Sequence, residues 1–163
     1  MDFTMVPLSL RSMQSPHFLD FLFEHLQSTG IAPGKICFDL TESEVQTQIS
    51  NVLSFCQTLS QVGCRLSLSG VSTRPGSYDV IKQLPVQIVR FDPLLTRQID
   101  KDAVERLATE SLHRIVSTLG KQSMLTQVKS DAVLKLAQKM GIHYVQGDAV
   151  AKPVSRPFSD ANA

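Results

Sequence analysis

Apolar residues recur along the chain with two alternating patterns, which predict strands and helices in turn. Short apolar runs without helical spacing predict buried strands. Apolar stripes at three- and four-residue spacing predict helices, and several of these stripes end at a glycine. We expect strands at 3–8, 35–40, 64–68, 87–91, 123–128 and 142–145, and helices at 17–27, 46–62, 76–83, 101–119 and 130–140.

Three of these helices have a stripe that should face a core. In helix 46–62 the stripe is Ile49, Val52, Leu53, Cys56, Leu59 and Val62. In helix 101–119 it is Val104, Leu107, Ala108, Leu112, Ile115 and Leu119, and in helix 130–140 it is Val133, Leu136, Ala137 and Met140. We expect all of these side chains to point inward.

Strands that alternate with helices predict an α/β protein with a parallel sheet of about six βα units. Periodicity does not separate a closed barrel from an open sheet, and six strands are too few for an eight-stranded barrel. The length of 163 residues suits a single domain. We expect this domain to cover residues 1–155 and residues 156–163 to form a flexible tail.

The composition of the chain excludes some classes of partner but does not indicate a function. A net charge of +1 argues for neither a nucleic acid nor a membrane surface as partner. Cys37, Cys56 and Cys64 form no CxxC pair, so we expect buried, reduced thiols and a cytoplasmic location. The sequence has no apolar run long enough to span a membrane, so any membrane anchor of the natural protein would lie outside these residues.

The ends of the predicted strands are where a parallel α/β protein places its chemistry. The residues there are Pro7, Asp39, Glu42, Ser69, Gly70, Arg90, Asp92, Thr126, Gln146 and Asp148. A metal-dependent hydrolase needs several convergent carboxylates, and this set is poor in acids. The spacing of Thr41 and Glu44 fits a capping box, which favours a structural role for the loop after Asp39.

Other catalytic patterns are missing from the sequence. It contains no GxSxG, GxGxxG or P-loop motif. The four histidines, His17, His25, His113 and His143, share no spacing typical of metal ligands, so we expect structural roles for them. Arg74 and Lys82 are interpreted as surface charges, with a phosphate contact as the alternative.

Four segments, taken together, resemble EAL domains, the cyclic-di-GMP phosphodiesterase family. They are VPLSLRSMQSPHFLDFL (6–22), DLTESEV (39–45), LPVQIVRFDPLLTRQID (84–100) and YVQGDAVAKPV (144–154). The resemblance implies a partial TIM-like (β/α) barrel of the EAL type, in which the chain supplies about the last two thirds and the N-terminal strands are missing. An open strand edge is a liability, so we expect an upstream segment or a homodimer to cover it. In the family, an upstream GGDEF domain is common.

The resemblance also implies a metal site whose ligands are replaced. EAL enzymes hold two divalent cations with an Asn, a Glu, an Asp-Asp pair and a further Glu, beside a catalytic Lys. The Asn position falls on Pro7, the Asp-Asp pair on Ser69 and Gly70, and the later Glu on Thr126. We therefore expect no metal, no cofactor and no hydrolysis.

Three positions keep part of the family's chemistry. The strand-end Glu falls on Asp39, the Lys on Arg90, and a Gln is retained as Gln146. Arginine keeps the charge of lysine but holds its proton too tightly to act as a base. We expect these three residues to be the remnant of a ligand site.

The resulting hypothesis is a catalytically inactive EAL-like regulatory domain that acts in bacterial signalling through protein partners. The first alternative is a cyclic-di-GMP receptor without hydrolysis. The second is an active phosphodiesterase with relocated ligands such as Glu42, Asp92 and Asp148. A third is an unrelated α/β enzyme with a coincidental likeness.

Overall fold

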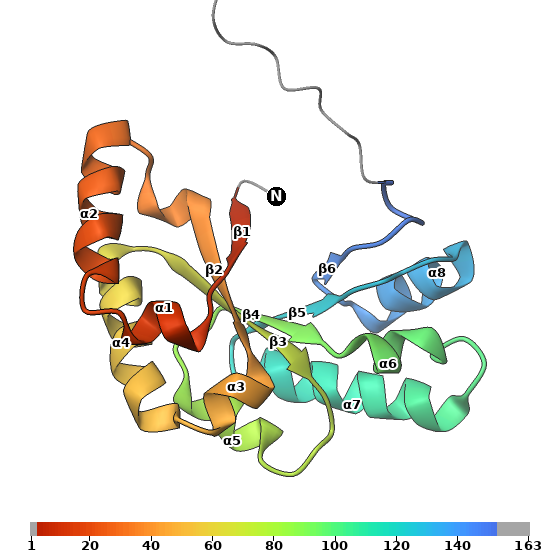
Figure 1. The fold of residues 1–163 in the computed structure, drawn as a ribbon. Coiled ribbons are helices and arrows are strands. Elements are labelled where there is room, and N and C mark those ends of the chain that lie inside the picture. The colour runs from red at the N-terminus through yellow and green to blue at the C-terminus, as the bar shows by residue number, and fades with distance from the viewer. Residues whose placement is uncertain (1–2, 153–163) are drawn as a thin grey trace, which may run out of the picture.

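Six parallel strands form one sheet in chain order (Figure 1). The computed structural model describes residues 3–152, so the predicted tail lies outside the described residues. The strands are β1 Thr4–Pro7, β2 Ile36–Thr41, β3 Arg65–Val71, β4 Ile88–Phe91, β5 Gln122–Leu125 and β6 Tyr144–Val145. The predicted α/β class and all six strands are confirmed, although β1, β5 and β6 are shorter than expected.

The five predicted helices are present, and three short ones were missed. The longer helices are α2 Phe18–Thr29, α4 Ile49–Val62, α5 Ser77–Gln83, α7 Ala103–Thr118 and α8 Asp131–Met140. The missed helices are α1 Leu10–Gln14, α3 Glu42–Gln46 and α6 Pro93–Arg97, and a 3-10 turn covers Pro33–Lys35. Each missed helix has five residues, which is too short to show an apolar stripe.

The sheet curls into a half-barrel, so its two edge strands approach each other across the inner face. In a flat sheet the first and sixth strands would lie about 24 Å apart. Instead, the rings of Phe3, beside β1, and Tyr144, on β6, meet edge to face with centroids 6.5 Å apart. The guanidinium of Arg65 lies 4.9 Å from the centre of the Phe3 ring, which adds a cation-π contact to this closure.

The two faces of the curled sheet bury different sets of side chains. The outer face packs against the helices and contributes strand residues such as Leu66, Val89 and Leu125 to the main core. The inner face holds a smaller apolar cluster of Cys37, Ile88 and Met124, with Phe3, Met5 and Tyr144 packed against it. This alternation along each strand decides which strand-end residues face the inner cavity.

The three cysteines are free and buried, as predicted. Cys37 lies in the inner cluster, whereas Cys56 and Cys64 belong to the main core. Burial raises the pKa of Cys56 to about 12, because the charged thiolate would lose its hydration. These thiols are therefore structural in the folded chain.

The predicted inward face of α7 is partly wrong. Val104 and Leu107 are 73% and 63% exposed, and the buried residues of α7 are Thr109, Leu112 and Val116. A helix of this length spans about 24 Å, whereas the four residues of β5 span about 13 Å. The first turns of α7 therefore extend beyond the strand that its second half covers, and they expose an apolar surface.

Two histidines join α7 to the segment before β6. The Nδ1 atom of His113 lies 2.8 Å from the hydroxyl of Ser123, whose backbone N–H donates to Nδ1 of His143 at 3.1 Å. The rings are 5.6 Å apart. Burial, the nearby His143 and Arg114 lower the pKa of His113. The expected structural role of these two histidines is confirmed.

This lowered pKa predicts a loss of stability in mild acid. The unfolded chain binds a proton at His113 more readily than the folded chain does. The free energy of unfolding should therefore fall as the pH drops below about 6.5, the ordinary value for histidine, by a few tenths of a kcal/mol for this partly exposed group. His113→Gln should reduce this slope in urea unfolding at several pH values, and exposed His17→Gln is the control. An unchanged slope in His113→Gln would contradict the assignment.

Gly147 allows the chain to cross closely over the segment after β5. The backbone N–H of Val128 donates to the carbonyl of Gln146, and the carbonyl of Val128 accepts from Ala149. A Cβ atom at position 147 would lie 2.2 Å from the carbonyl oxygen of Val128. Only glycine fits this crossing, because the obstacle is backbone rather than a flexible side chain.

Gly147→Ala should destabilise the fold by about 2–4 kcal/mol, since the clash can be relieved only by moving backbone. Gly30→Ala is the matched control: its φ is also positive, at 65°, but a Cβ there meets no atom within 4 Å. The control should cost about 1 kcal/mol, the strain of a left-handed residue. If chemical denaturation showed the same loss of unfolding free energy for Gly147→Ala and Gly30→Ala, the chain crossing at Gly147 would not be tight.

Candidate functional site

A polar layer lies on the inner face near the carboxyl ends of the strands. The carboxylate of Asp39 on β2 accepts from the hydroxyl of Ser67 at 2.5 Å and from Nη1 of Arg90 at 2.5 Å. The three residues come from the neighbouring strands β2, β3 and β4, so sheet pairing places them side by side. Asp39 is therefore occupied on both oxygens by groups of the same chain.

Arg90 is the centre of this layer. Its side chain is 21% exposed and that of Asp39 is 10% exposed, so the ion pair is mostly shielded from water. Its Nη2 atom reaches Oε1 of Gln146 at 3.4 Å, a weak contact that extends the layer beyond β6. The structure thus brings together Asp39, Arg90 and Gln146, the three residues that the sequence predicted as a residual ligand site.

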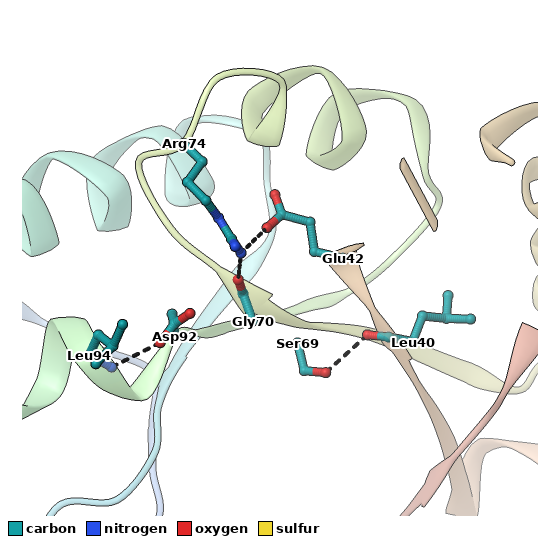
Figure 2. Close-up of polar contacts among 7 residues, drawn as sticks. All are labelled: Leu40, Glu42, Ser69, Gly70, Arg74, Asp92 and Leu94. Atoms are coloured by element: carbon teal, nitrogen blue, oxygen red, sulfur yellow. Dashed lines mark hydrogen bonds and ion pairs between the residues drawn. The ribbon is translucent and has the colours of Figure 1, made fainter. Parts of the chain in front are cut away.

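The end of β3 is irregular at Ser69 and Gly70. The register between β3 and β4 shifts between Leu68 and Val71, and Gly70 has φ of 76°. Such irregularities turn a strand away from regular pairing. The hydroxyl of Ser69 donates to the carbonyl of Leu40 at 3.1 Å, so it points to its own sheet rather than into the open end (Figure 2).

Arg74 fastens the loop after β3 to the start of α3. Its Nη2 atom donates to Oε2 of Glu42 at 3.0 Å and to the carbonyl of Gly70 at 2.8 Å (Figure 2). Glu42 is 1% exposed, and its second oxygen has no hydrogen-bond partner among residues 3–152. The Arg74 side chain is 55% exposed, which agrees with its interpretation as a surface charge, but its guanidinium also pairs with a buried carboxylate, which the sequence did not predict.

The predicted capping box is also wrong. Thr41 is the N-cap residue of α3, but its side chain makes no capping hydrogen bond. The first residue of α3 is Glu42, whose carboxylate turns toward Arg74 instead. The ion pair therefore replaces the local cap as the contact that fixes this loop.

The sequence offered Glu42, Asp92 and Asp148 as relocated metal ligands. Two of these three carboxylates already make other contacts within the chain. Glu42 binds Arg74, and the carboxylate of Asp92 accepts from the N–H of Leu94 as the cap of α6 (Figure 2). Asp148 is exposed and lies at the edge of a cavity. Within residues 3–152, no three His, Cys, Asp or Glu side chains gather as a metal site would require.

The other positions that the resemblance assigned to metal ligands supply no carboxylate. Pro7 is exposed at the end of β1, in register with Asp39, and has no side-chain donor or acceptor. Thr126 is 7% exposed and follows β5 with a neutral hydroxyl. A pair of divalent cations needs several convergent carboxylates. The residues present, with Asp39 already paired to an arginine, do not fit such a centre.

A cavity of about 450 Å³ opens beside Arg90. Its walls include Arg90, Thr126, Lys129, Gln146 and Asp148. The wall carries the guanidinium of Arg90, which is paired with Asp39, and the ammonium of Lys129, against the one carboxylate of Asp148, so donors that can bind an anionic group outnumber carboxylates in the wall. This is the open space next to the predicted residual site.

The sequence reasoning missed one site residue, Ser67, and one contact, the ion pair of Arg74 with Glu42. Ser67 lies inside a predicted strand, and only the alternation of faces would have placed it beside Asp39. The link between Arg74 and Glu42 joins residues 32 positions apart. The sequence hinted at this pair only in that Glu42 directly follows one predicted strand and Arg74 lies in the loop after the next strand.

The ion pair of Arg90 with Asp39 should contribute about 1–2 kcal/mol to folding, because it is largely shielded from water. The test is a double-mutant cycle of Arg90→Gln, Asp39→Asn and the double variant, measured by urea unfolding. Each single variant should be destabilised, and the double variant should lose less than the sum. Arg11→Gln removes an exposed positive charge as the control. Strict additivity would show that the pair is not coupled.

Curated proteins with similar sequences include cyclic-di-GMP phosphodiesterases and one RNase E specificity factor. The cyclic di-GMP phosphodiesterase PdeB of Shewanella oneidensis is 21% identical over 91% of this chain and 17% of its own length. The RNase E specificity factor CsrD of Escherichia coli is 25% identical over 90% of this chain and 23% of its own length. The chain thus spans about a fifth of the length of these curated relatives.

Solved structures share the fold at low sequence identity. The FimX EAL domain of Pseudomonas aeruginosa, bound to cyclic di-GMP, superposes with a TM-score of 0.88 at 22% identity. The match covers 93% of this chain and 62% of the FimX chain. The half-barrel therefore corresponds to part of an EAL barrel.

The family model of the EAL domain matches residues 1–153. This match covers nearly the whole chain, and it agrees with the relatives and the shared fold. An unrelated α/β enzyme is thereby excluded. The chain belongs to the EAL domain family, whose members are cyclic-di-GMP phosphodiesterases and related signalling proteins.

Proposed function

We propose that the chain is a catalytically inactive EAL domain that regulates bacterial signalling through protein partners. The observation that carries this proposal is the occupation of Asp39 by Arg90 and Ser67. Catalysis by two metal ions needs carboxylates free to bind them and a group that can accept a proton. Arg90 does the opposite on both counts, because it neutralises Asp39 and does not give up its own proton.

The strand ends around this pair support the same conclusion. Ser69 and Gly70, at the positions of the family's Asp-Asp pair, offer no carboxylate, and the hydroxyl of Ser69 binds Leu40. Arg74 draws the loop onto Glu42. With Asp39 and Glu42 each paired to an arginine of the same chain, few carboxylate oxygens remain free at the centre of the barrel.

A protein partner would find apolar surface on α7. Val104 and Leu107 lie on the exposed face of the first turns of α7, and Leu94 on α6 is 64% exposed. Exposed apolar side chains that lie close together are typical of protein–protein contacts. The relative named as an RNase E specificity factor supports a regulatory role of this kind within the family.

The second candidate is a cyclic-di-GMP receptor without hydrolysis. The cavity beside Arg90 favours it, because Arg90 and Lys129 could pair with phosphate oxygens. The EAL domain of FimX, with the same fold, is described as bound to this nucleotide. Both candidates exclude hydrolysis, and they differ in whether a nucleotide enters the cavity.

The test of inactivity is incubation of the full chain with cyclic-di-GMP and magnesium or manganese. We expect no linear dinucleotide above the blank, because no cation pair is held to activate water. An active member of the family assayed in parallel is the positive control. Turnover that disappears in Glu42→Gln or Asp148→Asn would refute the proposal in favour of relocated ligands.

Calorimetric titration of cyclic-di-GMP, with and without magnesium, separates the two candidates. The partner hypothesis predicts no binding at millimolar nucleotide. Micromolar binding that is lost in Arg90→Gln and kept in Arg11→Gln would establish the receptor instead. Capture experiments with the chain and with Leu107→Glu, which places a charge on the exposed face of α7, would then test the partner surface.

As for location, no helix within residues 3–152 is long and apolar enough to cross a membrane. The expected cytoplasmic location stays a prediction, as does the homodimer across the open edge of the sheet. The open edges themselves are β1 and β6.

A further inference from the structure

A second cavity, of about 250 Å³, adjoins the cavity beside Arg90 and shares Gln127 and Lys129 with it, but Arg90 itself does not line it. It is bounded by the end of α6, the turn that leads to α7 and the start of α8. The residues that matter in its wall are Thr96, Arg97, Asp100, Lys101, Lys129 and Ser130. We propose that this cavity binds a phosphate group, either free or carried by a small phosphomonoester.

Charge is the first argument. Arg97, Lys101 and Lys129 bring three positive charges to the wall, and Asp100 brings one negative charge. Asp131, in the first turn of α8, adds a second carboxylate nearby. The surroundings stay net positive, and arginine and lysine are the side chains that bind phosphate oxygens most strongly.

The start of α8 is the second argument. This helix has ten residues, and its N-cap Ser130 lies in the cavity wall while its hydroxyl accepts from the N–H of Val133. The positive end of the helix dipole is therefore directed at the cavity. Phosphate groups bind readily at such helix starts, where backbone N–H groups and the dipole act together.

An unused buried hydroxyl is the third and independent argument. Thr96 lies in the wall and is 1% exposed, yet its hydroxyl has no hydrogen-bond partner among residues 3–152. A buried hydroxyl without a partner costs free energy, so nearly all such groups in proteins are satisfied. A phosphate oxygen in the cavity would supply the missing acceptor.

The cavity is held open by contacts on both sides. Arg106 donates to the carbonyls of Ile99 and Asp100 at 3.1 and 3.4 Å and so fixes the turn before α7. On the other side, Gln127 has φ of 56° and accepts from Arg97 at 3.4 Å. A residue other than glycine in this conformation is strained, and strain of this kind collects at binding sites.

The test is calorimetric titration of inorganic phosphate into the full chain at constant ionic strength. Saturable binding is expected, and Lys101→Gln and Thr96→Val should each weaken it about tenfold through the loss of a hydrogen bond to a charged ligand. Lys139→Gln, an exposed lysine at the far end of α8, should leave it unchanged. Glycerol phosphate in a parallel titration identifies the source: tighter binding assigns a phosphomonoester, and equal or weaker binding assigns free phosphate.

Thr96→Val also separates a ligand role from a structural one. Without phosphate, the variant should be as stable as the original chain or more stable, because an unpartnered hydroxyl is removed. With phosphate, it should lose most of the rise in melting temperature that the original chain shows. A loss of stability without phosphate would overturn the assignment of the hydroxyl to a ligand.

Three other results would overturn the proposal. They are no saturation at millimolar phosphate, an equal loss of affinity in Lys139→Gln, and a loss in Arg90→Gln but not in Lys101→Gln. The last result would move the anion to the cavity beside Arg90. The inference does not rest on the proposed function, because phosphate binding is measured separately from cyclic-di-GMP binding and hydrolysis, and the Arg90→Gln variant distinguishes this cavity from the adjoining one.

Discussion

The contact between Asp39 and Arg90 joins the second and fourth strands across the inner face of the curled sheet. It passes over Ser67 on the strand between them, which donates to the same carboxylate. A carboxylate with so little access to water must find compensation within the protein. Arg90 meets this requirement, and the same guanidinium makes the weak contact with Gln146 and borders the cavity.

The order of elements could be predicted because the apolar pattern is strong wherever a long helix or a buried strand occurs. Gly30, Gly63 and Gly141 end α2, α4 and α8, as their positions in the sequence suggested. The misses have local causes. The five-residue helices are held by tertiary contacts and by caps such as Asp92, and α7 carries apolar residues on two faces. A sequence pattern does not say which of two apolar faces is covered.

The candidate site was predictable in part for a similar reason. The strand-end residues could be found from the strand positions, and the resemblance assigned them to family positions. Neither the strand positions nor the resemblance could predict the hydrogen-bond and ion-pair partners of these residues. From the sequence, Glu42 could be a metal ligand or the start of a helix cap. Its partner Arg74 becomes known only from the path of the loop, which brings the two side chains together. Likewise, the sequence predicts Asp39 as a retained ligand. The structure shows that its carboxylate is already neutralised by Arg90.

These partners suggest how a catalytic site can lose its function while the fold persists. A site for two cations concentrates negative charge, which repels itself unless the metal is present. Ser69 and Gly70 carry no charge, and arginines at positions 74 and 90 neutralise the two buried acids Glu42 and Asp39. The outcome is an end of the barrel whose main charges are balanced within the chain and need no metal for stability. Positive charge remains beside this ion pair at Lys129, which lies in the walls of both cavities. An anion, rather than a cation, is the ligand that this arrangement of charges favours.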